Sequence, residues 1–311
     1  GMLLVMKVLL TGATGFLGKN LMPVLSEKYE TIGIGSKDFD LRFQDDCRIM
    51  LRRNNPDVVI HAAGSVGGIG ANQQNPGKFL YENLIMGANL IHQAMDHNIS
   101  KFVLLGTVCA YPKMTAVPFD ESDLWKGYPE ETNAPYGIAK KTLMKMIETY
   151  REQYNFKGVN LIPVNMYGPH DHFNLTSSHV IPALILKVYN AMKNGDRSIT
   201  LWGTGQVSRE FLYAPDCAQA IIKAIETDVP PSPINIGTGK EIKICDLITE
   251  IAEQMGYEGE IKYDSSKPDG QPRRCLSTIK AKELLDFEAN TDLQTGLMHT
   301  IGWFLKDIKN P

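Results

Sequence analysis

Tyr136 and Lys140 lie four residues apart and form the pair in this sequence best suited to proton transfer. Residues at this spacing project from the same face of a helix. A tyrosine hydroxyl ordinarily titrates at about pH 10, and a cation within a few ångströms favours its phenolate form. The pair therefore predicts an acid–base tyrosine whose pKa is lowered by the Lys140 charge. Taken alone, the same spacing also fits the exposed start of an amphipathic helix.

Glycines near the N-terminus predict a second functional element, a loop that binds a dinucleotide. The segment Thr11-Gly-Ala-Thr-Gly-Phe-Leu-Gly18 follows a strand-like run and opens a helical pattern. Gly12 permits a tight turn, Gly15 lets the backbone approach a diphosphate, and Gly18 lets the helix pack closely on a sheet. A glycine-rich turn without a ligand is the competing interpretation, but the position at the start of a βαβ pattern favours nucleotide binding. The residues expected at the cofactor are Gly12, Ala13, Thr14, Gly15, Phe16, Leu17 and Gly18.

The end of the second expected strand bears on which nicotinamide cofactor binds. An acidic residue there would hold the ribose 2′-hydroxyl of NAD. The run Gly33-Ile-Gly-Ser-Lys37 contains none, whereas Ser36 and Lys37 suit the 2′-phosphate of NADP. We therefore expect NADP(H) rather than NAD, with Asp40 and Leu41 against the adenine edge. Lys37 otherwise fits an ordinary solvated lysine on a loop.

Strand and helix patterns alternate through the first half of the chain. This order indicates parallel strands covered on both faces, hence an α/β fold with a Rossmann-type, doubly wound parallel sheet. Ligands of such sheets bind at the C-terminal ends of the strands. The expected strands are residues 7–10, 31–35, 57–62, 102–105 and 159–164, and the expected helices are residues 16–26, 79–97 and 136–154.

The second half is less regular and predicts a smaller C-terminal α/β domain that binds the substrate. Helical patterns cover residues 181–192, 214–226, 244–255 and 293–305, and strand patterns cover 199–202 and 234–236. We expect residues 1–166 to form the NADP-binding domain and residues 210–236 to return to it. Residues 167–209 and 237–311 then form the substrate-binding domain.

The glycine loop followed by the Tyr136–Lys140 pair resembles the extended short-chain dehydrogenase/reductases, the NAD-dependent epimerase/dehydratase family. The resemblance implies that Tyr136 and Lys140 are catalytic and that Lys140 also holds the nicotinamide ribose. It places Thr107 at the end of the preceding strand, where a hydroxyl stabilises the substrate oxygen as it gains negative charge. The further cofactor contacts that it implies are Ala62, Ala63, Leu105, Lys140, Pro163, Asn165, Met166 and His179.

Cys109 and His179 indicate the branch of the family. Its dehydratases carry a glutamate where this chain has Cys109, whereas residues 66–72, 109–113, 165–171 and 178–183 resemble the GDP-L-fucose synthases, which are epimerase–reductases. The resemblance implies that Cys109 is the base and His179 the acid that invert C3 and C5 beside a 4-keto group. Hydride from NADPH then reduces C4, with a proton from Tyr136. By chemistry alone, Cys109 equally fits a small buried hydrophobe and His179 a helix start.

The implied substrate is GDP-4-keto-6-deoxy-D-mannose, which would become GDP-L-fucose or a close GDP-sugar analogue. Thr107 stands where this branch usually has serine, and Ser277 stands about where an aspartate is expected. A GDP-4-keto-3,6-dideoxy sugar or a GDP-4-keto heptose would use the same catalytic groups, so the sugar stays open. Trp202 also fits a core position and Arg209 a structural ion pair. The expected substrate contacts are Asn165, Lys187, Trp202 and Arg209.

Two other classes of function remain as alternatives. An NAD-dependent nucleotide-sugar 4-epimerase would need neither Cys109 nor His179 and would prefer an acidic residue after the second strand. A non-catalytic redox sensor or scaffold of the same fold would typically lack Tyr136 or Lys140, and both are present.

Composition limits the partners and the compartment. The chain has 311 residues and a net charge of −3, without the basic excess that nucleic-acid binding needs. No apolar run approaches the roughly 20 residues of a membrane span. Five scattered cysteines without a Cys-x-x-Cys pair argue against disulfides and a metal site and favour the cytoplasm. The two long helices expected at 79–97 and 136–154 suggest a homodimer.

Overall fold

The computed structural model describes residues 5–64, 74–175 and 179–310. Its centre is a six-stranded parallel sheet in the order β10-β5-β4-β3-β1-β2. Strands β1, β3, β4 and β5 are almost wholly buried on both faces, as expected for short, nearly continuous apolar runs, whereas the edge strand β2 is mostly not buried. Their bounds are β1 Lys7–Thr11, β2 Glu30–Ile34, β3 Val58–His61, β4 Lys101–Leu105, β5 Gly158–Pro163 and β10 Ile234–Ile236. The strand order reverses between β1 and β3, which predicts the ligand crevice at their C-terminal ends.

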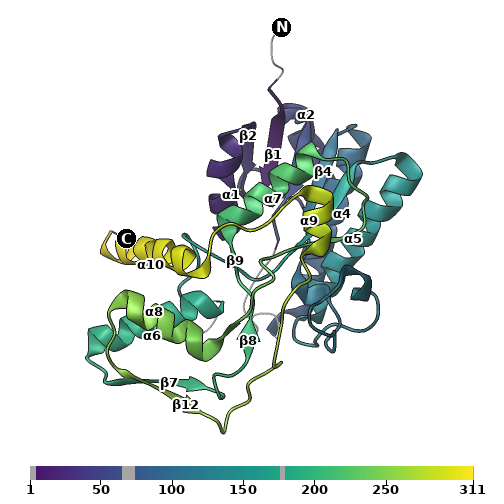
Figure 1. Ribbon diagram of the computed structural model, residues 1–311. Coiled ribbons are helices and arrows are strands. Elements are labelled where there is room, and N and C mark those ends of the chain that lie inside the picture. The colour runs from purple at the N-terminus through teal and green to yellow at the C-terminus, as the bar shows by residue number, and fades with distance from the viewer. Residues whose placement is uncertain (1–4, 65–73, 176–178, 311) are drawn as a thin grey trace.

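Helices cover both faces of this sheet (Figure 1). On one face α4 packs against α5 and α2, and on the other α1 packs against α7. The long helix α5 ends at Asn155, whose left-handed backbone (φ 54°) stops helical hydrogen bonding. The bounds are α1 Phe16–Ser26, α2 Gln44–Asn54, α4 Pro76–Asp96, α5 Ala134–Tyr154 and α7 Ala214–Glu226.

A second hydrophobic core lies beside the sheet domain. Helices α6 (Val180–Asn194), α8 (Ile244–Met255) and α10 (Leu293–Lys309) enclose it together with the parallel strands β7 (Ser198–Trp202) and β12 (Glu260–Asp264). Short strands connect the two cores, namely β6 (Met166–Tyr167) with β9 (Leu212–Tyr213) and β8 (Ser208–Arg209) with β11 (Ile242–Lys243). The chain then returns to the first core through α7, β10 and α9 (Ile279–Leu285).

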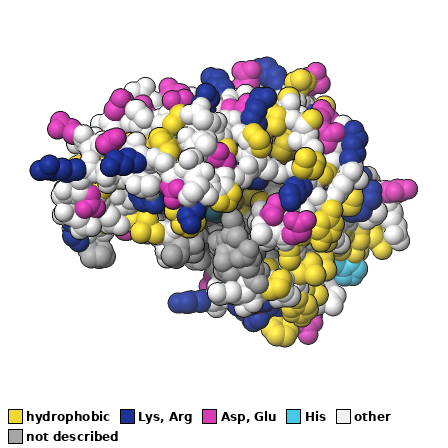
Figure 2. Space-filling model, turned by 90° about the horizontal axis from the view of Figure 1, so that it is seen from below, with side chains coloured by type: hydrophobic (Ala, Val, Ile, Leu, Met, Phe, Trp, Pro, Cys, Tyr) yellow, Lys and Arg dark blue, Asp and Glu magenta, His cyan; other side chains and the backbone are white. Residues whose placement is uncertain are grey.

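The expected α/β sheet is confirmed, and the ends of the expected elements lie within four residues of those observed. The patterns did not predict α2, α9 and β12, nor the two-residue strands β6, β8, β9 and β11. Residues 66–72, which contributed to the family resemblance, lie outside the described residues. Within the part of the chain that is described, no helix has the length and apolar character needed to cross a membrane. Acidic and basic side chains are interspersed on the face seen in Figure 2.

A fully buried carboxylate joins the two parts of the chain beside the site described below. Glu210 accepts backbone hydrogen bonds from Thr238 (2.5 Å), Gly239 (2.8 Å) and Leu276 (2.8 Å). Three donors compensate the charge for its lost hydration. Glu210 therefore holds the loop after β10 and the C-terminal segment near 276 against the chain that carries Arg209.

We expect Glu210→Ala to lower the free energy of unfolding by about 3 kcal/mol, because it leaves three backbone N–H groups without their acceptor. Urea unfolding followed by circular dichroism measures the change. Glu258→Ala, which removes an exposed carboxylate, should change the same quantity by less than about 0.5 kcal/mol. A loss below about 1 kcal/mol for Glu210→Ala would contradict the structural role of this carboxylate.

Candidate active site

The glycine loop between β1 and α1 has the geometry of a diphosphate cradle. Gly12 has φ +69°, and a Cβ there would lie 2.9 Å from the Ala63 backbone. A Cβ on Gly18 would collide with the carbonyl of Gly12, whereas Gly15 has only Gly12 O nearby, at 3.6 Å. No side chain caps the N-terminus of α1, and its first turn has no acidic residue. Its backbone N–H groups are therefore suited to a diphosphate, and the residues present fit a dinucleotide.

A buried hydrogen-bond network sets the opposite wall of the crevice. The Thr11 hydroxyl accepts the N–H groups of Ala62 (3.0 Å) and Ala63 (3.1 Å). Its own proton is therefore donated to Nδ1 of His61, 2.8 Å away. Burial and the Lys140 charge keep the pKa of His61 well below its usual value, so the ring is neutral. This network positions Ala62 and Ala63 beside Gly12, at the reversal of strand order.

The chain after β2 differs from the sequence interpretation at Leu41 and at Asp38. Ser36 and Lys37 are exposed, as a contact to a ligand requires, but Leu41 is packed in the core. The Asp40 carboxylate is occupied by the Arg42 guanidinium. The backbone N–H of Gly35 donates to Asp38 Oδ2 at 2.8 Å. An acidic group therefore does lie at the end of the second strand; counting 20 residues from Gly18 would have found it.

Thr107, Cys109 and Tyr136 meet beyond the C-terminal end of β4. Thr107 begins a short 3-10 helix, Val108–Ala110, and its hydroxyl accepts the N–H of Cys109 at 3.1 Å. Gly137 packs directly against this turn, because a Cβ at 137 would lie 2.6 Å from the Cys109 carbonyl oxygen. The start of α5 therefore brings Tyr136 beside Cys109, with Lys140 one turn further along the helix.

Burial determines the protonation of this group of side chains. It raises the pKa of Tyr136 well above its ordinary value, and the charge of Cys109 adds to the increase. Burial also lowers the pKa of Lys140, which is 3% exposed, to about 8. The expectation that Lys140 lowers the Tyr136 pKa is thus not met, because desolvation dominates. Tyr136 is a phenol at neutral pH, the form that can donate a proton.

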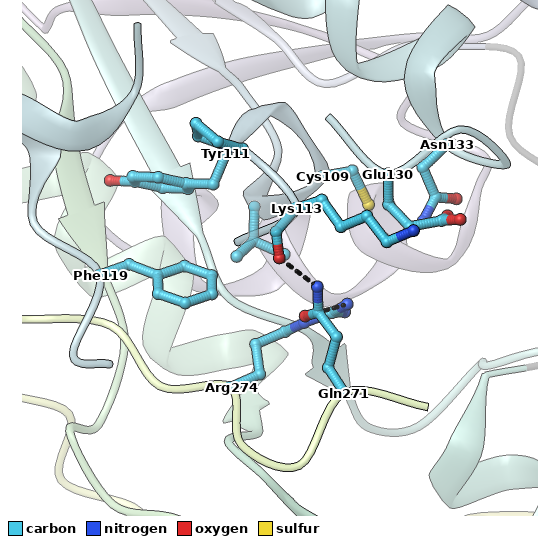
Figure 3. A pocket seen from close by; sticks show the side chains of 10 residues that line it. Cys109, Tyr111, Lys113, Phe119, Glu130, Asn133, Gln271 and Arg274 are labelled. Atoms are coloured by element: carbon cyan, nitrogen blue, oxygen red, sulfur yellow. Dashed lines mark hydrogen bonds between the residues drawn. The ribbon is translucent and has the colours of Figure 1, made fainter. Parts of the chain in front are cut away.

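A pocket opens from Cys109 toward the segment 271–274 (Figure 3). Gln271 donates to the Lys113 carbonyl oxygen and accepts from Arg274, so it fixes one wall. The rings of Tyr111 and Phe119 pack against each other, with their centroids 5.2 Å apart, and form an apolar wall. The remaining polar groups are those of Lys113, Glu130 and Asn133. Residues far apart in the sequence therefore build a polar pocket that ends at a thiol.

Two arginines lie at the outer part of this region. Arg209 donates to the carbonyl oxygens of Ser208 (2.7 Å) and Gln271 (2.8 Å). Burial and the positive charge of Arg274 lower the pKa of Arg209 to about 10. Among the described residues, neither guanidinium forms a salt bridge with a carboxylate. Two guanidinium groups without a salt bridge suit a diphosphate, and sequence analysis missed Arg274 because no local pattern distinguishes it.

The other expected site residues are spread around this region. His179 directly precedes α6, and its side chain is exposed. Desolvation of its ring, and then the positive charge of His172, lower the pKa of His179. Lys187 is half-buried on α6, and Trp202 is 73% exposed at the end of β7, with the Lys267 ammonium 5.3 Å from its ring. No hydrogen bond between described residues joins His179 to Cys109 or Tyr136. Residues at the C-terminal ends of β4 and β5 or just beyond are Leu105, Pro163, Asn165 and Met166.

Comparisons with known proteins identify the family of this chain. The NAD dependent epimerase/dehydratase family matches residues 8–237. GDP-L-colitose synthase of Yersinia pseudotuberculosis is 40% identical over 98% of this chain and 100% of its own. GDP-L-fucose synthase of Escherichia coli K12 is 35% identical over 97% of both. The structure of a GDP-L-fucose synthetase from Naegleria fowleri bound to NADP has a TM-score of 0.88 at 28% identity, covering 98% of this chain and 95% of that one. The chain therefore belongs to the NAD dependent epimerase/dehydratase family.

Proposed function

We propose that this protein is an NADP(H)-dependent 3,5-epimerase and 4-reductase that converts GDP-4-keto-6-deoxy-D-mannose to GDP-L-fucose. The observation that carries the proposal is the thiol of Cys109 beside the phenol of Tyr136, at the C-terminal end of β4. A thiol is a suitable base for a carbon acid next to a ketone, and a phenol can protonate that ketone as it is reduced. The name of the Escherichia coli relative, GDP-L-fucose synthase at 35% identity, supports the same reaction.

The epimerase half-reactions need two proton carriers. The 4-keto group acidifies the protons on C3 and C5, and Cys109 removes each of them in turn. His179 delivers a proton from the opposite side of the ring, which inverts the centre. Thr107 donates a hydrogen bond to the keto oxygen and stabilises the negative charge that develops there. The lowered pKa of His179 makes its protonated form a stronger acid.

The reductase step uses Tyr136 and Lys140 together with the cofactor. Bound NADPH supplies the hydride for C4. Tyr136 donates its proton to the C4 oxygen, and the ammonium group of Lys140 stabilises the resulting phenolate and holds the nicotinamide ribose. The high pKa of Tyr136 keeps the proton available until the oxygen gains charge.

The nucleotide end of the substrate requires cations and an aromatic surface. Arg209 and Arg274 neutralise the diphosphate, Trp202 stacks on the guanine, and Lys187 and Asn165 complete the contacts. The exposed indole of Trp202 and the two guanidinium groups, which form no salt bridge with a described carboxylate, support this assignment.

The reaction is tested with purified protein, NADPH and GDP-4-keto-6-deoxy-D-mannose. Cofactor oxidation is followed by absorbance, and NMR identifies the sugar. GDP-L-fucose as product would establish the proposal. Tightly held NAD with no net oxidation would instead support a nucleotide-sugar 4-epimerase and overturn it.

A second candidate substrate is a GDP-4-keto-3,6-dideoxy sugar. The observation that favours it is the relative named GDP-L-colitose synthase, at 40% identity over nearly the whole chain. The same residues would then invert one centre before reduction. A competition between the two keto sugars, read from the product ratio by NMR, decides between them.

Two further proposals concern assembly and location. We propose a homodimer through the outer faces of α4 and α5, where Leu84 and Ile85 are half-buried and Tyr81 is exposed. Sedimentation measures the mass directly. The described cysteines are all free, which supports the cytoplasm as the location.

Reduction should depend on pH through Lys140, because burial places its pKa at about 8 instead of its ordinary 10.5. Raising the pH through this value removes the ammonium charge, so we expect kcat/KM for reduction to fall above about pH 8. The Lys140→Arg variant keeps its charge over the same range. Its residual activity should therefore lack this descending limb; a limb that persists unchanged in the variant would assign the titration to another group.

A further inference from the structure

Asp38 lies just beyond the C-terminal end of β2, the strand end at which dinucleotide-binding folds hold the adenosine ribose. Its Oδ2 accepts the backbone N–H of Gly35, which directly follows β2. A Cβ built on Gly35 would be 2.8 Å from the Thr14 side chain and 3.5 Å from Asp38 Oδ2. The carboxylate is therefore next to the glycine loop. Asp38 is exposed, and its second oxygen accepts no hydrogen bond from the described residues.

Two cationic residues, Lys37 and Arg42, lie close to Asp38 in the sequence. Lys37 is exposed and can reach a phosphate. Arg42 is the next cation along the chain. Its Nη2 lies 2.7 Å from Asp40 Oδ2, and its Nη1 lies 3.7 Å from Glu82 Oε1. Of these two cations, only Lys37 forms no salt bridge with a described residue, so a 2′-phosphate here would have Lys37 on one side and the Asp38 carboxylate on the other.

A carboxylate distinguishes the two cofactors by charge and by hydrogen bonding. The ribose 2′- and 3′-hydroxyls of NADH can donate to the free oxygen of Asp38. The 2′-phosphate of NADPH is an anion and is repelled by the same group. We propose that Asp38 is a specificity-determining residue that weakens the preference for NADPH, so that the protein also accepts NADH. This inference rests on the cofactor site of the proposed function.

The test measures binding of each cofactor without any sugar. Dissociation constants for NADPH and NADH are obtained from cofactor fluorescence for the wild type, Asp38→Asn and Asp38→Ser. Asparagine keeps an oxygen that can accept from Gly35 and removes only the charge. We expect both variants to raise the ratio of NADPH to NADH affinity by about tenfold. Asp45→Asn, a change at an exposed carboxylate on α2, should leave the ratio unchanged.

Two results would overturn the inference. One is a ratio in Asp38→Asn and Asp38→Ser that stays within about twofold of the wild type. The other is a wild-type protein that already rejects NADH by about a thousandfold. The kcat/KM values for both cofactors with the keto sugar then separate the two proposals. A shifted affinity ratio without turnover would remove the proposed reaction only, whereas GDP-L-fucose formation with an unshifted ratio would remove the role of Asp38 only.

Discussion

Tyr136→Phe should slow the reduction of the keto sugar by about 10²- to 10⁴-fold, because the variant has no proton to donate to the C4 oxygen. The ring is retained, so its packing at the start of α5 and the position of Cys109 should not change. NADPH binding by fluorescence should therefore remain close to that of the wild type. Single-turnover cofactor oxidation measures the chemical step directly.

Tyr154→Phe provides the matched control, since it makes the same change at the exposed end of α5. Its rate should be indistinguishable from that of the wild type. If Tyr136→Phe kept more than about a tenth of the activity, another donor would have to protonate the oxygen.

Cys109→Ser should separate epimerisation from reduction. An alcohol is a far weaker base than a thiolate, so exchange of the C3 and C5 protons with deuterated water should fall by about 10²- to 10⁴-fold. Tyr136 and Lys140 remain in place, so the ketone should still be reduced. NMR should then show an uninverted sugar as the main product, formed with continued oxidation of NADPH.

Cys245→Ser is the comparison, because this half-buried thiol lies outside the site. It should leave both exchange and reduction unchanged. Undiminished exchange in Cys109→Ser would exclude the thiol as the base. An equal loss of exchange and reduction would instead mean that Cys109 only positions the neighbouring turn.

Local periodicity explains which elements could be predicted. Helices α1 and α7 and strand β10 have the expected bounds because each carries a complete apolar pattern. Helix α2 was missed because its sequence is mostly charged and polar, and only three residues, Cys47, Met50 and Leu51, are buried. Strand β12 was missed because it has intermediate burial and depends on pairing with β7. Both elements therefore depend on contacts with other parts of the fold more than on a local apolar pattern.

The glycine loop and the Tyr136–Lys140 pair could be predicted because each depends on spacing over fewer than about 20 residues, and the parallel sheet could be predicted from the alternation of strand and helix patterns. Which charged groups meet depends on the three-dimensional fold. It brings Arg274 near Arg209, 65 positions away in the sequence. It also raises the pKa of Tyr136, where the sequence predicted a decrease. These outcomes depend on burial and on contacts between distant segments, which a pattern of neighbouring residues does not contain.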